Sequence, residues 1–228
     1  MRTTAVGEVV LALHDSDPRV VELELVDPDL VQHREQHVLS CVNQVLGLQH
    51  RHISQVLGAG IHEGLIYVCR AHRLGRSLAE VMDGPIGLPE LGPGIAFGVA
   101  EALAFLAEEG HRPGVCSLGG FDARDVWLGF DGSISVTGTG FQTLREVECP
   151  LTADLDALFV LMDDLGGWLG RAFAPTRPLG LEEVARALRR SHREACGRRT
   201  SFVGAHVRAI FPEAVLRERS FFGLTTLH

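Results

Sequence analysis

The sequence contains no lysine, and all 21 of its basic residues are arginine in a chain of 228 residues. A lysine amine serves as the point charge on phosphate in a Walker loop and as the nucleophile in Schiff-base chemistry. Arginine does neither job well, because it is a planar fork rather than a compact point charge and because its guanidinium group stays protonated. The absence of lysine therefore excludes every mechanism that depends on this side chain.

Cysteine is scarce, and the spacing of the cysteines indicates neither a metal site nor a disulfide framework. The five cysteines include no CxxC pair and their number is odd, which argues against a disulfide framework. Glu8 interrupts the apolar N-terminal run and no small-residue cleavage site follows it, so we expect no secretory signal. The most apolar stretch, residues 95–110, contains Glu101 and is too short to span a bilayer. These features predict a cytoplasmic protein that does not contact membranes.

The charge balance is acidic. The chain has 29 acidic and 21 basic residues, a net charge of −8, which disfavours nucleic acid and anionic membranes as partners. Residues 181–220 reverse this balance with nine arginines against five acidic residues, and we interpret them as a solvated helix face. With 46% hydrophobic residues the chain can form a sizeable core, and its length suits one domain, or one domain of two lobes.

Apolar periodicity divides the chain into a strand-rich first part and a helical second part. We expect strands over 7–14, 19–26, 55–61 and 65–71, with one helix over 29–47 between the two pairs. A serine at position 77 suits the N-cap of a short helix, and longer helices are expected over 93–109, 152–172, 181–195 and 201–211. Two strand-like runs, VWLGF and SISVT, flank an Asp-Gly turn at 131–132.

This order of elements resembles that of a bacterial Ser/Thr protein kinase domain, and four segments carry the resemblance. QVLGAGIHEGLIYVCRAHRLGRSLAEVM is similar to the fourth and fifth strands, the hinge and the next helix of such domains. VAEALAFLAEEG resembles the long buried helix before the catalytic loop, and TADLDALFVLMDDL resembles the helix that anchors the C-lobe. FDARDVWLGFDGSISVTGTGF resembles the catalytic loop and the strand pair that leads to the magnesium motif.

The resemblance covers roughly residues 7–210 and implies an α+β, protein kinase-like bilobal fold. It predicts a truncated β-sheet N-lobe with one helix over residues 1–73 and a mainly α-helical C-lobe over 74–228, together one domain. The glycine-rich loop is expected to be missing, because the chain starts near its last glycine, Gly7.

The same resemblance implies that the catalytic chemistry is absent. Glu24 stands where the family has the lysine of V-A-I-K, and Cys41 stands where the glutamate that pairs with this lysine belongs. Gly120 replaces the aspartate of the HRD motif and Gly138 replaces the aspartate of DFG. Asp125 replaces the asparagine that helps to hold the second magnesium ion, and one carboxylate does not build a two-metal site.

The nucleotide pocket is altered in shape as well. Glu22 aligns with the alanine above the adenine, and Trp127 aligns with the leucine below it, where an indole would fill the space of a purine. The Glu24 carboxylate would repel a phosphate that faces it. We therefore expect no ATP binding, no cofactor and no enzymatic activity.

Structural positions of the family are retained. Asp154 aligns with the aspartate that caps the backbone of the catalytic loop, and Arg199 aligns with the late C-lobe arginine. The segment between Gly140 and Thr152 is too short for a full activation loop and lacks the APE motif, so a substrate-peptide platform is not expected.

Histidine spacing allows one competing interpretation. His33 and His37 would lie one turn apart on the predicted helix, with His50 and His52 nearby in sequence, an arrangement that invites zinc. No cysteine spacing or HExxH motif supports a metal site, so we interpret these residues as surface histidines. Cys41, among apolar neighbours, is interpreted as a packing residue rather than a reactive thiol.

Loss of catalytic residues on a retained scaffold is the pattern of a pseudokinase. We expect a catalytically inactive scaffold or allosteric regulator in bacterial signalling that binds a protein partner, such as an active kinase, with a homodimer as a further possibility. Two alternatives stay open. One is a divergent transferase that uses Asp122, Asp125 and Asp131. The other is a structural protein that assembles through the edge of its truncated sheet.

Overall fold

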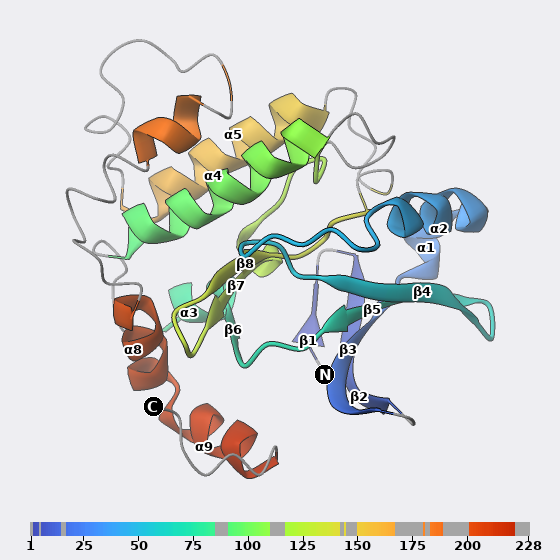
Figure 1. The fold of residues 1–228 in the computed structure, drawn as a ribbon, viewed down its shortest axis with the longest axis horizontal. Coiled ribbons are helices and arrows are strands. Elements are labelled where there is room, and N and C mark those ends of the chain that lie inside the picture. The colour runs from blue at the N-terminus through green and yellow to red at the C-terminus, as the bar shows by residue number, and fades with distance from the viewer. Residues whose placement is uncertain are drawn as a thin grey trace.

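The computed structural model describes residues 2–4, 6–14, 17–84, 91–109, 117–141, 144, 150–166, 180, 183–188 and 201–221. A strand-rich part formed by the first third of the chain lies beside a part formed mainly of helices (Figure 1). One continuous set of buried apolar side chains runs through both parts. This arrangement agrees with the division expected from the apolar periodicity.

A five-stranded antiparallel sheet forms the first part. Its strands lie in the order β1-β2-β3-β5-β4, with β1 at Arg2–Thr3, β2 at Gly7–His14, β3 at Asp17–Val26, β4 at Val56–His62 and β5 at Leu65–Ala71. The four predicted strands are confirmed, whereas the two-residue β1 was not foreseen. The turn between β1 and β2 is closed by a hydrogen bond of 2.8 Å from the Thr4 amide to the Gly7 carbonyl. Its Val6 is buried in the core.

The single helix predicted over 29–47 is wrong. The structure has two helices, α1 at Pro28–Val31 and α2 at Glu35–Gln44, separated by left-handed residues with φ of 44° at Gln32 and 66° at His33. Arg34 stabilises this break, because its guanidinium donates to the Leu30 carbonyl at 3.0 Å and to the Val31 carbonyl at 3.2 Å.

The break between α1 and α2 separates His33 from His37, the pair that suggested a zinc site. His33 belongs to the left-handed turn and His37 belongs to α2, so the two do not occupy successive turns of one helix. Both side chains are exposed. The helical spacing that invited a zinc site is therefore not present.

A second, three-stranded antiparallel sheet connects the first sheet to the helices. Its order is β6-β7-β8, with β6 at Gly75–Ser77, β7 at Val126–Gly129 and β8 at Ile134–Val136. The predicted pair of runs around the Asp-Gly turn is confirmed as β7 and β8. Helix α3, Leu78–Met82, follows β6 directly, and Ser77 forms a capping box with Glu80, as its position suggested.

The remaining described helices pack on this second sheet or near it. They are α4 at Gly92–Glu108, α5 at Pro150–Asp164, α8 at Ser201–Ile210 and α9 at Pro212–Phe221. The predicted helices over 93–109 and 201–211 are confirmed, α5 begins near the predicted position, and α9 was not predicted. Residues 183–188 are helical within the predicted 181–195, and the rest of that range lies outside the described residues. Among the described helices none has the length and hydropathy needed to cross a membrane.

The segment before β4 joins the two parts of the molecule. Ile53 forms a parallel bridge with Val136 on β8, and backbone hydrogen bonds of 2.8 and 2.9 Å link Ser54 and His52 to the same residue. The His52 ring adds a bond, because Nδ1 donates to the Ile134 carbonyl at 2.7 Å. The entry to the first sheet is thus held against the second.

Burial of His52 makes this joint sensitive to pH. Burial lowers the pKa of His52 from its ordinary 6.5 to about 4, because a charged imidazole would lose its hydration beside the ring of Phe97. The pKa of His50, stacked on Phe105 at 4.7 Å, is lowered by burial as well. Both histidines are therefore held in the neutral form in the folded chain at neutral pH.

We expect the free energy of unfolding to fall as the pH drops from about 6.5 towards 4. The unfolded chain binds a proton at His52 near pH 6.5, whereas the folded chain binds it only near pH 4, so acid favours the unfolded state in this window. Urea unfolding at pH 7 and pH 5 should show that His52→Gln removes about 2 kcal/mol of this pH dependence. His37→Gln, an exposed control on α2, should keep the slope of the parent. An equal slope for His52→Gln and the parent would contradict the prediction.

Candidate functional site

A buried ion pair lies where the resemblance placed a catalytic lysine. Glu24 on β3 faces the interior, and the Arg70 guanidinium on β5 donates from Nε to Glu24 Oε2 at 3.0 Å. Only 1% of the Arg70 side chain and 3% of the Glu24 side chain are exposed. Glu24 was expected to repel phosphate as a carboxylate, and the structure adds that Arg70 lies against it as a counter-charge.

Arg70 also reaches the turn that follows β8. Its two terminal nitrogens donate to the Thr139 hydroxyl at 3.2 Å and to the Thr139 carbonyl at 3.1 Å, and its guanidinium lies 5.4 Å from the centre of the Phe141 ring. Every nitrogen of the guanidinium therefore has a partner inside the protein. The ion pair joins β3 and β5 to residues 138–141.

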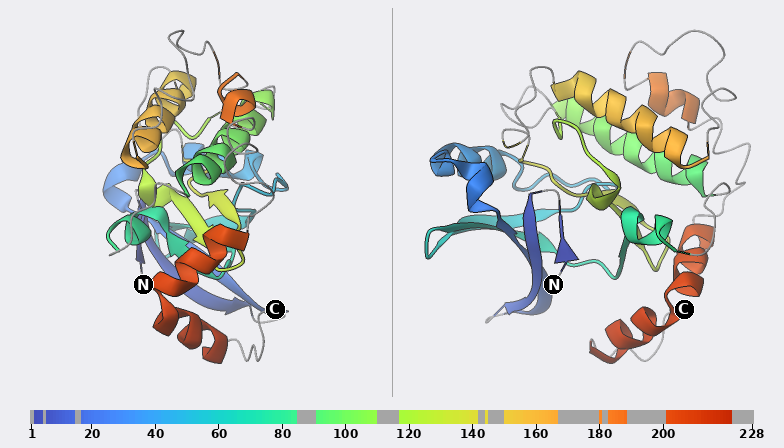
Figure 2. Two further views of the ribbon diagram at one scale, coloured as in Figure 1. Left: turned by 90° about the vertical axis from the view of Figure 1, so that its left-hand side faces the viewer. Right: turned by 180° about the vertical axis from the view of Figure 1, so that it is seen from behind.

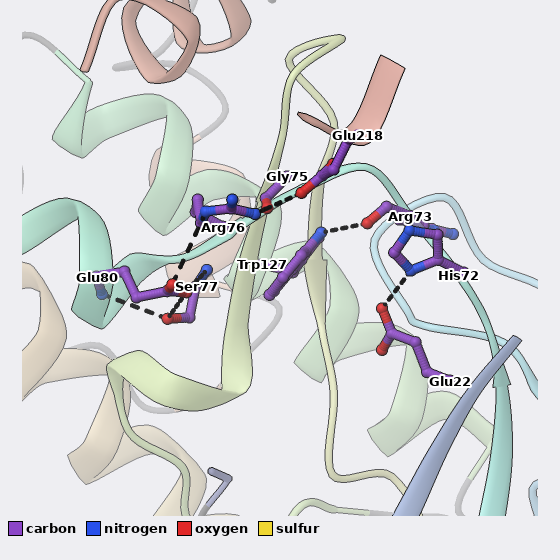
Figure 3. Close-up of polar contacts among 9 residues, drawn as sticks. All are labelled: Glu22, His72, Arg73, Gly75, Arg76, Ser77, Glu80, Trp127 and Glu218. Carbon is purple, nitrogen blue, oxygen red and sulfur yellow. Dashed lines mark hydrogen bonds and ion pairs between the residues drawn. The ribbon is translucent and has the colours of Figure 1, made fainter. Parts of the chain in front are cut away.

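A second carboxylate of β3 is paired in the same way. Glu22 lies two residues from Glu24 on the same face of the sheet, and His72 Nδ1 donates to Glu22 Oε1 at 2.8 Å (Figure 3). Both side chains are largely buried, with 10% of His72 and 6% of Glu22 exposed. Glu22 therefore holds the chain between β5 and β6 against the sheet.

Trp127 holds the chain between β5 and β6 on the side opposite to Glu22. It lies on β7 with 7% of its surface exposed, and its indole N–H donates to the Arg73 carbonyl at 3.1 Å (Figure 3). Gly75 makes room for the ring, because a Cβ atom at that position would lie 2.8 Å from the indole nitrogen. The connection between the two sheets, residues 72–75, is thus bonded to β3 on one side and to β7 on the other.

The C-terminal helix α9 is tied to the same region through Arg76. The Arg76 guanidinium pairs with Glu218 of α9 at 2.5 Å (Figure 3). It also lies 5.7 Å from the centre of the Phe130 ring and 5.8 Å from that of Phe211. Arg208 of α8 donates to the Phe130 carbonyl. The C-terminal helices therefore brace the β6–β7 strand pair beside the chain segment that leads into it.

Asp154 organises the loop before β7. The residue lies on α5 with none of its surface exposed, and its carboxylate accepts from the Ser117 hydroxyl at 2.7 Å, the Leu118 amide at 2.9 Å and the Gly120 amide at 2.7 Å. This contact agrees with the capping role that the resemblance gave to Asp154. Arg199, the other retained position, lies outside the described residues.

Comparison with known proteins rests on structure alone, since no family model and no curated protein matches the sequence. A crystal structure of the PknI kinase domain of Mycobacterium tuberculosis is 21% identical over 83% of this chain and 93% of that chain, with a TM-score of 0.63. Another crystal structure of this domain is 21% identical over 86% of this chain and 93% of that chain, with a TM-score of 0.64. A double mutant of the domain is 19% identical over 94% of this chain and 93% of that chain, with a TM-score of 0.60. The chain has a protein kinase-like fold. The predicted bilobal α+β architecture is thereby confirmed.

Within the kinase-like fold, the expected degenerate positions take up structural roles or carry no side chain. Cys41 on α2 is 5% exposed and belongs to the apolar interior. Gly120 and Gly138 have φ of 87° and 77°, in the left-handed region that glycine adopts readily, and neither residue carries a side chain. At these two positions the kinase-like backbone has adopted a conformation that suits glycine.

The three aspartates of the transferase alternative each stabilise a turn. Asp122 accepts from the Arg124 amide at 2.7 Å and pairs with the Arg124 side chain at 2.6 Å. Asp125 is 2% exposed and accepts from the Asp122 amide at 3.1 Å, while Asp131 accepts from the Ser133 amide at 2.8 Å. In the described ranges no three histidine, cysteine or acidic side chains gather as metal ligands would.

Sequence reasoning missed Arg70 and Arg76, which make the two most connected ion pairs of the region. Arg70 lies 46 positions from Glu24, and Arg76 lies 142 positions from Glu218. The one available signal was the pattern of β3, where Glu22 and Glu24 alternate with apolar residues. It marks two carboxylates on one face of a strand, without showing that the face is buried.

Proposed function

We propose that this protein is a catalytically inactive pseudokinase that does not bind ATP and acts in the bacterial cytoplasm as a protein-binding scaffold or allosteric regulator. The observation that carries the proposal is the buried pair of Glu24 and Arg70, bonded onwards to Thr139. It spans the positions that the resemblance assigns to the phosphate-binding lysine and to the magnesium motif.

The pair occupies the Arg70 guanidinium, so this cation is not available to phosphate. Arg70 would have to release a carboxylate, a hydroxyl and a carbonyl before it could bind a triphosphate, and Glu24 would then be a buried charge without a partner. Breaking a buried ion pair in this way is strongly unfavourable. A nucleotide would therefore have to disrupt the joint between the lobes in order to bind.

The burial of Trp127 supports an occluded purine position. The resemblance puts this residue below the purine, and its indole N–H already donates to the Arg73 carbonyl. An incoming purine would have to displace a side chain that is packed and hydrogen-bonded. This contact supports the expectation that neither the base nor the phosphates of ATP are accommodated.

Proton transfer has no candidate group at the catalytic position. Gly120 carries no side chain, and the carboxylate of Asp125 is buried and bonded to its own turn. General-base catalysis requires a titratable group within hydrogen-bond reach of the substrate proton. Since all three aspartates of the alternative stabilise turns, no observation favours the transferase.

Calorimetric titration separates the contributions of charge and shape. We expect neither magnesium-ATP nor adenosine to bind the parent at millimolar concentration, with an active bacterial kinase domain as the positive control. Trp127→Leu removes the indole, so this variant should gain weak binding of adenosine while magnesium-ATP still fails beside the Glu24–Arg70 pair. Micromolar binding of magnesium-ATP to the parent would refute the proposal.

The partner proposed for the scaffold is a protein, such as an active kinase or another signalling component, and a second copy of the chain is a further possibility. Retained structure around Asp154 supports a rigid domain that presents its surface. Affinity capture from the native cytoplasm, followed by reconstitution with the purified partner, identifies it. A protein that shows no saturable partner would contradict a scaffold role.

A further inference from the structure

Strand β3 has an unusual distribution of charge across the sheet. Its carboxylates, Glu22 and Glu24, point to the interior, whereas Leu23 and Leu25 point to the opposite side. A strand with one solvated face normally shows the reverse pattern, with apolar side chains inside and charged ones outside. The side of the sheet away from the core is therefore apolar.

Neighbouring strands continue this apolar surface. Leu23 pairs with Val10 on β2 and with Cys69 on β5, and Leu25 pairs with Tyr67. We call the surface made by Val10, Leu23, Leu25, Leu65, Tyr67 and Cys69 the outer sheet face. Leu65 is 40% exposed and the other five side chains are half-buried by their neighbours in the sheet.

Gly60 keeps the outer sheet face open on the β4 side. It lies opposite Tyr67, and a Cβ atom there would lie 2.7 Å from the tyrosine hydroxyl. The ring can therefore lie across the backbone of β4. This arrangement widens the apolar surface beyond the three central strands.

No described helix covers the outer sheet face. Helices α1 and α2 lie on the other side of the sheet, where Val31, Val38 and Val42 join the core (Figures 1 and 2). The described C-terminal helices α8 and α9 pack near the second sheet instead (Figure 2). A contiguous apolar surface of this kind is typical of an interaction site.

We propose that the outer sheet face binds an amphipathic helix of the partner protein, with basic residues beside its apolar stripe. The proposal rests on the scaffold function and deepens it by naming the surface and the chemistry of the partner. A helix that lays its apolar face on a sheet is a common solution to covering such a face.

The size of the face suits a helix better than a second copy of the chain. Strands about 4.8 Å apart with a rise of about 3.3 Å per residue make four strands of five to six residues roughly 19 by 17 Å. A helix of about three turns, some 10 Å wide, fits on this area. Two copies stacked face to face would bury roughly 700 Å², less than the 1,200 Å² or more of a stable dimer.

Charge at the margin of the face selects a basic partner. Among side chains that the structure describes there, Glu8 on β2 pairs with Leu25 and is exposed on the same side of the sheet, and Glu63 is exposed at the turn between β4 and β5. Two stacked copies would bring margins of the same sign together, whereas arginine or lysine on a helix would complement them. The net charge of −8 on the chain favours the same partner.

Three synthetic helical peptides test the proposal by calorimetry. All carry 14 residues, two of them with leucine at helical spacing flanked by either arginine or glutamate, and the third with the arginine sequence scrambled. We expect the arginine peptide to bind with a Kd of about 10–100 μM, and the other two to bind at least about tenfold more weakly. An arginine peptide that does not bind at 1 mM, or binds no better than the glutamate peptide, overturns the proposal.

Variants place the binding on the outer sheet face. Leu65→Gln, at an exposed position, should lower the affinity for the arginine peptide about tenfold or more. Leu23→Gln, once shown to be folded, should have the same effect. Val160→Gln on α5, where 62% of the side chain is exposed, is the matched control and should bind like the parent. Equal affinity of Leu65→Gln and the parent would assign the binding to another surface.

Sedimentation of the protein alone distinguishes the other occupant. A dimer that Leu65→Gln dissociates would show that a second copy covers the face and would overturn the proposal. The nucleotide titrations test the pseudokinase function separately. If the parent binds neither the arginine peptide nor magnesium-ATP, the proposed docking face is rejected and the pseudokinase function is not.

Discussion

Replacing Arg70 by methionine is expected to lower the free energy of unfolding by about 3–5 kcal/mol, because the change leaves the Glu24 carboxylate buried without a counter-charge. The bonds to Thr139 are lost at the same time. Urea denaturation followed by circular dichroism at pH 7 measures the difference. The effect should be large because the pair is almost completely excluded from solvent.

Two variants make this result specific. In Glu24→Leu/Arg70→Met both charges are replaced by apolar side chains, and its stability should return to within about 1 kcal/mol of the parent. Arg51→Met breaks an exposed pair with Glu101, in which 66% of the arginine is exposed, and should cost less than about 1 kcal/mol. An Arg70→Met variant as stable as Arg51→Met would show that the buried pair contributes little.

Asp154→Ala is expected to be the most damaging single substitution on α5. It would leave the Ser117 hydroxyl and the amides of Leu118 and Gly120 without their buried acceptor. Since a hydrogen bond to a charged group contributes about 1.5–3 kcal/mol, a loss of about 4 kcal/mol or more is expected. That is a large part of the stability of an ordinary domain.

Asp163→Asn on the same helix provides the control for this substitution. Asp163 is exposed, so the free energy of unfolding should change by less than about 0.5 kcal/mol. Chemical denaturation and hydrogen exchange of the Leu118 and Gly120 amides report on the loop directly. Protection of these amides in Asp154→Ala equal to that in the parent would contradict the capping role.

Much of the fold could be predicted because local patterns and tertiary packing agree. The segments rich in β-branched residues, which favour strands locally, are the ones that pair with one another in the sheet as β2, β3, β4 and β5. Ser77 could be assigned as an N-cap because the side chains of the capping box lie only three residues apart. Asp154 could be placed because its position in a run of family-like residues was intact.

The failures have a different physical origin. Periodicity did not show the break at Gln32 and His33, because the bonds from Arg34 that stabilise it depend on the folded turn. Pairs such as Glu24 with Arg70 connect distant segments, and sequence spacing contains no information about them. The site could therefore be located by resemblance, whereas its internal neutralisation could be seen only in three dimensions.

The burial of Trp127 gives the molecule an optical reporter of its own. The chain has two tryptophans, and a Trp168→Phe variant would leave Trp127 as the single indole. An indole buried and hydrogen-bonded to the Arg73 carbonyl emits at shorter wavelength than one in water, so its fluorescence follows the separation of the hinge from β7. Binding of a partner that moves the lobes apart would therefore shift this emission to longer wavelength, and the shift can be measured without an added label.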